Sequence, residues 1–346
     1  MAYSTIVKPG DYFNTKLYTG NGSTQSITGV GFQPDFLWIK ERSSISSHTA
    51  HDAVRGATKY LTPNTTDVEG TGFVTSFDSD GFTLPVSNLS NQNNETYASW
   101  NWKAGTTAIP SGSTTDPLGV SINTTSGFGI YKITSPGSGS YVLKHGLGKK
   151  PKMVIVKDLE ASQKWMVWSD TFSNLTNDYL QLNDTAAKAT YSTCWGTMNS
   201  TDCTISVGGT LDANNDHVVY IFTDTTGYSK FGSYTGDGNT NGPFVYTGFK
   251  PAFFMTKRTD AGAGWQMYDS TRDVDNPADH RLQAQSNAVE LVGDANTDID
   301  FLSNGFNLRN ADADSNASGG NYIYMAFAEE PLVANSGTDG VPATAR

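Results

Sequence analysis

The sequence predicts an all-β protein built from three tandem, related β-sandwich modules of jelly-roll-like topology. Composition is one reason: charged residues make up 16%, aromatic residues 12%, and Gly, Ser, Thr and Asn are abundant. Long amphipathic helices need Ala, Leu, Glu and Lys, whereas this composition suits short strands joined by turns. The second reason is internal repetition, since three stretches of the 346-residue chain resemble one another.

The repeat begins with a Tyr-containing segment and continues into a Gly-x-x-Pro-x run of apolar residues that ends in Lys. The three copies are residues 17–22 with 31–42, the more diverged 130–134 with 146–157, and 233–238 with 248–258. Each copy spans about 100 residues, a size that can bury its own core. The predicted division is an N-terminal arm (1–16), a first module (17–105), a linker (106–125), a second module (126–226), a third module (227–333) and a C-terminal tail (334–346).

Within each module, a continuous apolar run predicts a central strand buried on both faces: residues 36–39, 153–156 and 253–256. Further along each module comes an aspartate, Asp52, Asp170 or Asp269. Turn residues predict hairpins at 78–81 and 303–305. Each module closes on an aromatic strand, at 97–102, 217–222 and 322–327.

Aromatic residues are numerous enough to raise two interpretations. At positions shared by the modules they are expected to fill the core, as for the sets Phe36/Met153/Phe253 and Trp102/Phe222/Phe327. At unshared loop positions, such as Trp195, a stacking platform for a sugar is the alternative.

Charge and hydropathy exclude several classes of partner. The net charge of −11 disfavours nucleic acid and anionic membranes. No run of 18 apolar residues is present, so membrane insertion is not expected. The first residues lack a basic stretch followed by an apolar core, so we expect no signal peptide, synthesis in a host cytoplasm and release by lysis.

Polar motifs give no signal for an enzyme. His48 and His51 precede Asp52, but the other copies lack paired histidines, so we interpret this segment as a surface loop. The recurring Asp-x-x-Arg (Asp52/Arg55 and Asp269/Arg272) is interpreted as a structural bond that orients a loop, which the second module lacks because it has Ser173 at the arginine position. Nucleophile elbows, phosphate loops and dinucleotide fingerprints are absent.

No cofactor is predicted, although three acidic turns (78–81, 237–241 and 312–316) resemble fragments of calcium loops. Hairpin turns select Asp, Asn and Gly in any case, and none of the three has the full calcium spacing. Cys194 and Cys203 lie in one predicted hairpin. They are interpreted as buried thiols, with a disulfide as the alternative.

Module one and the chain end carry a family resemblance. The Tyr-Thr-Gly-Asn-Gly start at 18–22, the Gly-Phe-Gln-Pro-Asp-Phe-Leu-Trp-Ile-Lys segment at 31–40, the Ala-Ser-Trp-Asn-Trp-Lys-Ala-Gly end at 98–105 and the closing 340–346 resemble a domain of virion proteins from marine tailed phages. The match is strong over module one, good over module three and weak over module two. The resemblance implies lectin-like β-sandwich modules displayed on tails or heads, and it brings no catalytic residues.

The function expected from these observations is that of a non-enzymatic virion structural protein, a tail-fibre or tail-tip adhesin that binds a host surface glycan or protein. The alternatives are a capsid decoration protein, for which three modules would mimic a trimer around a threefold axis, and a polysaccharide depolymerase. A linear array of modules would favour the fibre. Expected partners are other virion proteins, with the chain as a homo-oligomer on the particle. The predicted ligand contacts are unshared loop residues: His48, Trp195, Asn239 and Arg309.

Overall fold

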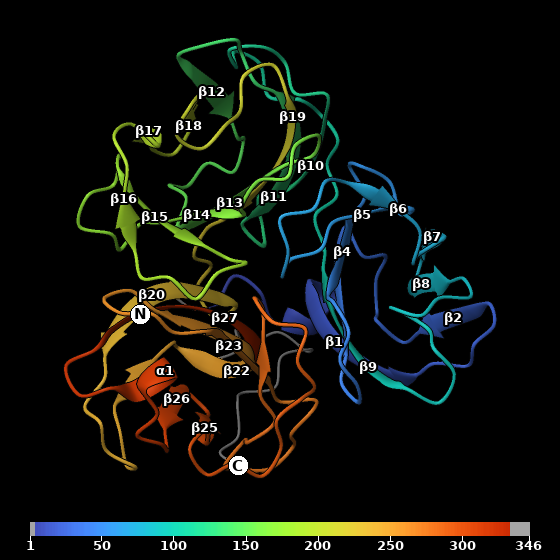
Figure 1. Ribbon diagram of the computed structural model, residues 1–346, viewed down its shortest axis with the longest axis vertical. Coiled ribbons are helices and arrows are strands. Elements are labelled where there is room, and N and C mark those ends of the chain that lie inside the picture. Colours follow the sequence, from blue (N-terminus) through green and yellow to red (C-terminus); the bar gives the residue numbers. More distant parts are fainter. Residues whose placement is uncertain (1–3, 333–346) are drawn as a thin grey trace.

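The computed structural model describes residues 4–332, and nearly all of their regular structure is β-strand (Figure 1). The exceptions are the short helices η1 (Pro9–Asp11) and α1 (Ala313–Asn316). All named strand pairs are antiparallel and most belong to three large and three small sheets. This confirms the predicted all-β sandwich class. Among the described residues, no helix is long and apolar enough to cross a lipid bilayer.

The three large sheets share one order for four of their strands, and the second and third sheets have further strands at their edges. The first is β1 (Phe13–Thr19), β9 (Thr96–Trp102), β3 (Phe36–Glu41) and β4 (Thr49–Asp52). The second is β10 (Gly119–Asn123), β11 (Phe128–Thr134), β19 (Asp216–Phe222), β13 (Met153–Asp158), β14 (Met166–Ser169), β15 (Asp178–Gln181) and β16 (Ala189–Thr190). The third is β20 (Ser229–Thr235), β27 (Asn321–Pro331), β22 (Phe249–Arg258), β23 (Trp265–Asp269) and β24 (Leu282–Gln283).

Each large sheet is faced by a small three-stranded sheet. These are β2 (Gln25–Thr28), β8 (Gly81–Leu84) and β7 (Ser76–Asp78); β12 (Ser140–Lys144), β18 (Asp202–Ser206) and β17 (Trp195–Met198); and β21 (Phe244–Tyr246), β26 (Gly305–Leu308) and β25 (Ile299–Leu302). A separate ribbon pairs β5 (Lys59–Tyr60) with β6 (Gly70–Thr71). We call the three sheet pairs sandwich 1 (β1–β9), sandwich 2 (β10–β19) and sandwich 3 (β20–β27). The predicted hairpins at 78–81 and 303–305 are confirmed as the turns of β7–β8 and β25–β26.

Strand register makes the three sandwiches comparable residue by residue. Phe36 lies opposite Trp102, Met153 opposite Phe222, and Phe253 opposite Phe327. All six side chains are at most 6% exposed, so their predicted place in the core is confirmed. On the other flank, the partners of Phe36, Met153 and Phe253 are Asp52, Ser169 and Asp269. The equivalent of the two aspartates in sandwich 2 is therefore Ser169, and the alignment of Asp170 with them was one residue too far along.

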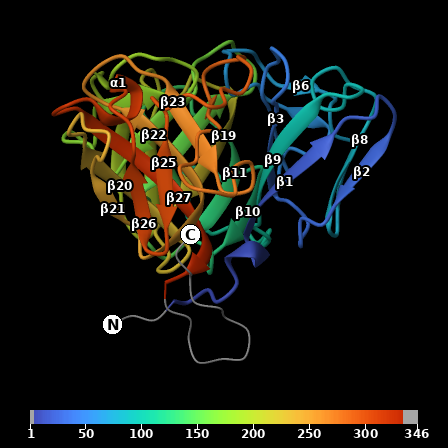
Figure 2. The same ribbon diagram turned by 90° about the horizontal axis from the view of Figure 1, so that it is seen from below.

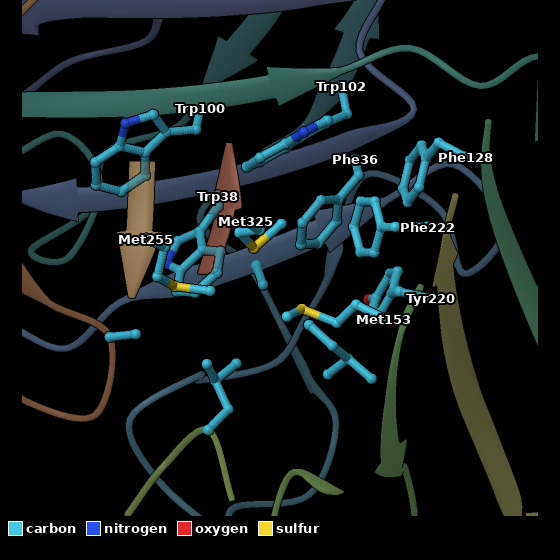
Figure 3. Packing of buried hydrophobic residues seen from close by; sticks show 14 of the residues in the cluster. Phe36, Trp38, Trp100, Trp102, Phe128, Met153, Tyr220, Phe222, Met255 and Met325 are labelled. Atoms are coloured by element: carbon cyan, nitrogen blue, oxygen red, sulfur yellow. The ribbon is translucent and has the colours of Figure 1, made fainter. Parts of the chain in front are cut away.

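Alternation along the central strands divides their side chains between two kinds of core. In β3, Leu37 and Ile39 face the small sheet and belong to the core inside sandwich 1, while Phe36 and Trp38 face away from it. The outward faces of all three large sheets pack on one another and form a single central core (Figure 3). Because that core takes residues from all three sandwiches, the sandwiches gather around a common centre and do not form a line (Figure 1).

Two predicted boundaries differ from the structure. Strand β1 begins at Phe13, inside the predicted arm, and β10 lies inside the predicted linker, where it pairs with β11. The predicted C-terminal tail lies outside the described residues. The two ends of the described chain meet, because both Ser4 and Pro331 lie against Gly227. We call this side of the molecule, where β9, β19 and β27 lead out of the sandwiches, the terminal end (lower side of Figure 2), and the opposite side the distal end.

Candidate functional site

The sandwiches contact one another in a cyclic order, 1 to 2, 2 to 3 and 3 to 1. A backbone hydrogen bond repeats at each contact: Glu69 N to Leu159 O (3.0 Å), Lys188 N to Thr259 O (2.9 Å) and Glu290 N to Arg42 O (2.9 Å). A ring N–H also repeats: Trp165 Nε1 to Thr62 O (3.2 Å), Trp265 Nε1 to Gln181 O (2.9 Å) and His48 Nε2 to Gln283 O (3.1 Å). The repetition of both bonds closes the three sandwiches into a ring of threefold character.

The first Asp-x-x-Arg motif lies at the contact between sandwiches 1 and 2. Arg55 Nε donates to Asp52 Oδ2 (2.6 Å), and Asp52 Oδ1 accepts from the backbone of Val54 and Arg55, which confirms that the motif orients a loop. Tyr220 of sandwich 2 donates its hydroxyl proton to Asp52 Oδ2 (2.8 Å). Burial lowers and the nearby Asp52 carboxylate raises the pKa of Arg55, with a net rise, so this side chain stays charged.

The second Asp-x-x-Arg motif, Asp269/Arg272, forms the equivalent contact between sandwiches 3 and 1. Arg272 is paired with Asp269 and with Glu290, and Trp100 Nε1 donates to Asp269 Oδ2 (2.9 Å). Trp100 and Tyr220 occupy equivalent positions of β9 and β19, two residues before Trp102 and Phe222. The third equivalent is Met325, which has no proton to donate.

The contact between sandwiches 2 and 3 is the apolar version of this arrangement. Ser169 takes the place of the aspartate and the buried Phe172 that of the arginine, so Ser173 is not the equivalent of Arg55. Lys188 takes the place of the glutamate and pairs with Asp178 instead. Donor, acid and base are thus present together at two contacts and absent together at the third, as expected of parts of one structural unit.

His48 and Trp195 were predicted to lie on an exposed contact surface, and this is wrong. His48 is fully buried: its Nδ1 accepts from Trp38 Nε1 (2.8 Å), and burial lowers its pKa to about 3. His51 is equally buried, so the segment is a buried strand and not a surface loop. Trp195 is 2% exposed in the core of sandwich 2 and donates to Asp178 O (3.1 Å).

Asn239 and Arg309 lie at the surface, and the fold brings them near each other. Arg309 hydrogen-bonds Asn241 and lies 3.3 Å from Asp300 Oδ2. Asn239, two residues from Asn241, is exposed, and its carbonyl oxygen accepts from Asn316 Nδ2 (2.9 Å). The side chain of Arg309 is 40% exposed. These two predicted residues therefore share one patch on sandwich 3.

A groove of about 310 Å³ on sandwich 2 was not predicted. Its lining comes from three loops and from strands β14 and β15, and includes Gln163, Lys164, Gln181, Tyr191 and Asp212. Gln163 Nε2 donates to Asp212 Oδ2 (2.7 Å), Lys164 Nζ donates to Gln181 Oε1 (2.7 Å), and Tyr191 is 52% exposed. We call it the distal groove, because the loops that form it follow β13 and β18 at the distal end. An exposed ring among amides and charges can stack on a sugar and bind its hydroxyls.

The acidic turns proposed as calcium fragments use their carboxylates within the fold. Asp80 accepts from the backbone N–H groups of Gly29 and Gly31, Asp237 from that of Asn239, and Asp312 caps α1. A different group, Asp273, Asp279 and His280, places its potential ligand atoms within 4.8 Å of one another. No periodic pattern in the sequence indicates this group, because its three residues lie in the loop between β23 and β24.

Cys194 and Cys203 are buried and free, as the favoured interpretation predicted. Burial raises the pKa of the Cys203 thiol, which keeps it protonated and unreactive.

Comparison with known proteins places the chain in a family. No curated protein matches it. A family model described as a domain of unknown function, DUF7483, matches residues 8–331 and so spans all three sandwiches in one piece. The chain therefore belongs to the DUF7483 family.

Proposed function

We propose that the chain is a non-enzymatic structural protein on the surface of a phage particle, attached through its terminal end and binding a host surface glycan through its distal end. The observation that carries the proposal is this polarity. Both ends of the described chain meet at Gly227, whereas the distal groove takes residues from the loops that follow β13 and β18, at the other end of these strands. Attachment at one end leaves the other free to meet a ligand.

The chemistry of the distal groove supports a glycan as ligand. Tyr191 offers an exposed ring face, and Gln163, Lys164 and Asp212 offer donors and acceptors already aligned by mutual hydrogen bonds. Individual sites of this kind are weak, and display of many copies on one particle would convert modest affinity into firm attachment.

The absence of catalysis is proposed because the most reactive-looking groups are committed to internal contacts. Both Asp-x-x-Arg pairs are fully buried between sandwiches, and His48 is held by Trp38 and backbone carbonyls. Substitution of any of these groups is therefore expected to lower the free energy of unfolding and to have no effect on a reaction.

A capsid decoration protein is the second candidate, and the ring of three sandwiches favours it. A threefold-like body matches a threefold position on a head lattice. The linear array expected of a fibre shaft is not the arrangement of the described residues, so a tail location would be a tip or knob.

The test combines location with binding. Cryo-electron microscopy of intact particles would place the protein at the tail or on the head. On a glycan array, Tyr191→Ala should lose at least tenfold in binding, while Tyr246→Ala, another exposed tyrosine (58%) outside the groove, should bind normally. Head density would support decoration, and equal loss in both variants or no glycan binding would overturn the glycan proposal.

A further inference from the structure

Strand β10 occupies the groove between sandwiches 1 and 2. It pairs with β11, with Gly119 opposite Lys132 and Ser121 opposite Ile130. Val120 and Ile122 enter the core of sandwich 2, while the Ser121 hydroxyl donates to Asp35 Oδ1 of sandwich 1 (2.9 Å). Gly119 lies against Val54, since a Cβ at this position would come within 3.1 Å of Val54 Cγ1. The strand is thus an extended segment held between one sheet edge and the neighbouring sandwich.

Within residues 4–332, no strand occupies the same position at the other two contacts. Strands β1 and β20 are equivalent to β11, because Phe13, Phe128 and Ser229 lie opposite Trp102, Phe222 and Phe327. Both are edge strands of their sheets among the described strands. A groove of about 310 Å³ runs along β1 and one of about 470 Å³ along β20.

The groove along β20, here called the β20 groove, has walls equivalent to those around β10. One wall is Thr171 of sandwich 2, which corresponds to Val54, and the other is Ser233, which corresponds to Lys132. Phe172 stands where the other two contacts have an arginine, so among the described residues the Asp–Arg pair of those contacts has no equivalent in the β20 groove. Lys188 pairs with Asp178 of its own sandwich. The part of the groove beside Ser233 is therefore equivalent to a position that the chain fills elsewhere with its own strand β10.

The free part of the β20 edge can be located from the register. Residues 119, 121 and 123 of β10 face β11, because the backbone of the intervening Ile122 bonds Thr106 on the other side. By equivalence Ser233 and Thr235, both exposed, direct their backbone N–H and C=O groups to the open edge. The beginning of β20 is covered, since Thr225 bridges Ser229 and Asp224 accepts from Phe231 N.

We propose that the β20 groove binds an extended segment of another protein chain, which adds to the sheet antiparallel to β20. The occupant is a peptide and not a glycan because backbone groups at alternate residues of an edge strand match the spacing of a second backbone. Following β10, a small residue should lie against Thr171 and aliphatic residues should face sandwich 3. This inference is independent of the glycan proposal, because it concerns a different surface.

Tethering tests the proposal with the intact chain. The probe is a peptide with the sequence of residues 116–123 (Asp-Pro-Leu-Gly-Val-Ser-Ile-Asn), joined through Gly-Gly to a cysteine and attached by a disulfide to a Ser173→Cys variant. Cys194 and Cys203 are buried and should not react. The tether raises the local peptide concentration to about the millimolar range, so that a few backbone bonds are enough for binding.

The readout is amide hydrogen exchange at Ser233, the equivalent of Lys132, which lies opposite Gly119 of β10. We expect exchange at this amide to slow at least tenfold with the tethered peptide. The matched control is the same peptide N-methylated at the leucine, glycine and serine, which removes the N–H of Leu118 that donates to Lys132 O in the native strand and those of the next two residues that face β11. Equal exchange with both peptides, or no slowing with the first, would overturn the proposal. An unchanged melting temperature of the untethered Ser173→Cys variant shows that the fold is intact.

Discussion

Removal of the Tyr220 hydroxyl tests the contact between sandwiches 1 and 2 with the smallest change in side-chain volume. Tyr220→Phe removes one oxygen and keeps the ring that packs on Phe36, with centroids 4.7 Å apart. Lost with it is a buried hydrogen bond of 2.8 Å to Asp52. Hydrogen bonds to charged groups contribute about 1.5–3 kcal/mol, so we expect the unfolding equilibrium constant to rise roughly 10- to 140-fold.

Urea denaturation followed by tryptophan fluorescence measures this change, because Trp38, Trp100 and Trp102 lie in the central core. The control is Met325→Leu at the equivalent position of sandwich 3, where no donor is lost and the cost should stay below about 1.5 kcal/mol. A double-mutant cycle with Asp52→Asn should return a coupling energy of about 0.5–3 kcal/mol. If Tyr220→Phe stays within about 0.5 kcal/mol of the unmodified chain, the contact is not held together by this bond.

Three further outcomes follow from the buried groups. Phe327→Ala should cost about 3–5 kcal/mol and weaken all three sandwiches in one calorimetric transition, since its ring touches residues of each; separate transitions would contradict a shared core. Arg272→Met should cost about 3–5 kcal/mol by leaving Asp269 and Glu290 buried without a cation, and an effect under about 1 kcal/mol would count against the pair. Burial lowers the pKa of both His48 and His51 to about 3, so the folded state resists protonation that the unfolded chain accepts near pH 6.5. Each histidine should lower the stability by about 2 kcal/mol between pH 7 and pH 5, so His48→Gln should lose about 2 kcal/mol less than the unmodified chain over this range, and an equal loss in both would contradict the burial of His48.

The fold class could be predicted because its signals are local. Turn residues at 78–81 and 303–305 and the continuous apolar runs act within a few residues of themselves. The alignment of Asp170 with Asp52 and Asp269 failed on spacing: both aspartates stand 16 positions after the first residue of the apolar run, and the residue 16 positions after Met153 is Ser169. The strand pairs confirm the same register, with Phe36, Phe253 and Met153 opposite Asp52, Asp269 and Ser169.

The candidate site was harder to predict because it depends on contacts between sandwiches. Nothing near His48 in the sequence shows that Gln283 and Ser286 cover its ring. Composition marked the segment before β10 as a linker, and the partner that makes residues 119–123 a strand lies on β11. The distal groove combines Gln163, Tyr191 and Asp212 from three loops, so no single motif could have indicated it.

Because one chain encodes all three sandwiches of the ring, the surface of each sandwich can change independently of the other two. Three identical subunits around an axis must repeat every substitution three times, whereas here each sandwich is encoded separately. One contact has Ser169, Phe172 and Met325 where the other two have an acid, a base and a donor. Strand β10 fills one edge, while the other two are unpaired among the described strands, and the distal groove is formed by residues of sandwich 2 alone. The molecule thus has the stable outline of a symmetric trimer with three faces free to acquire different partners.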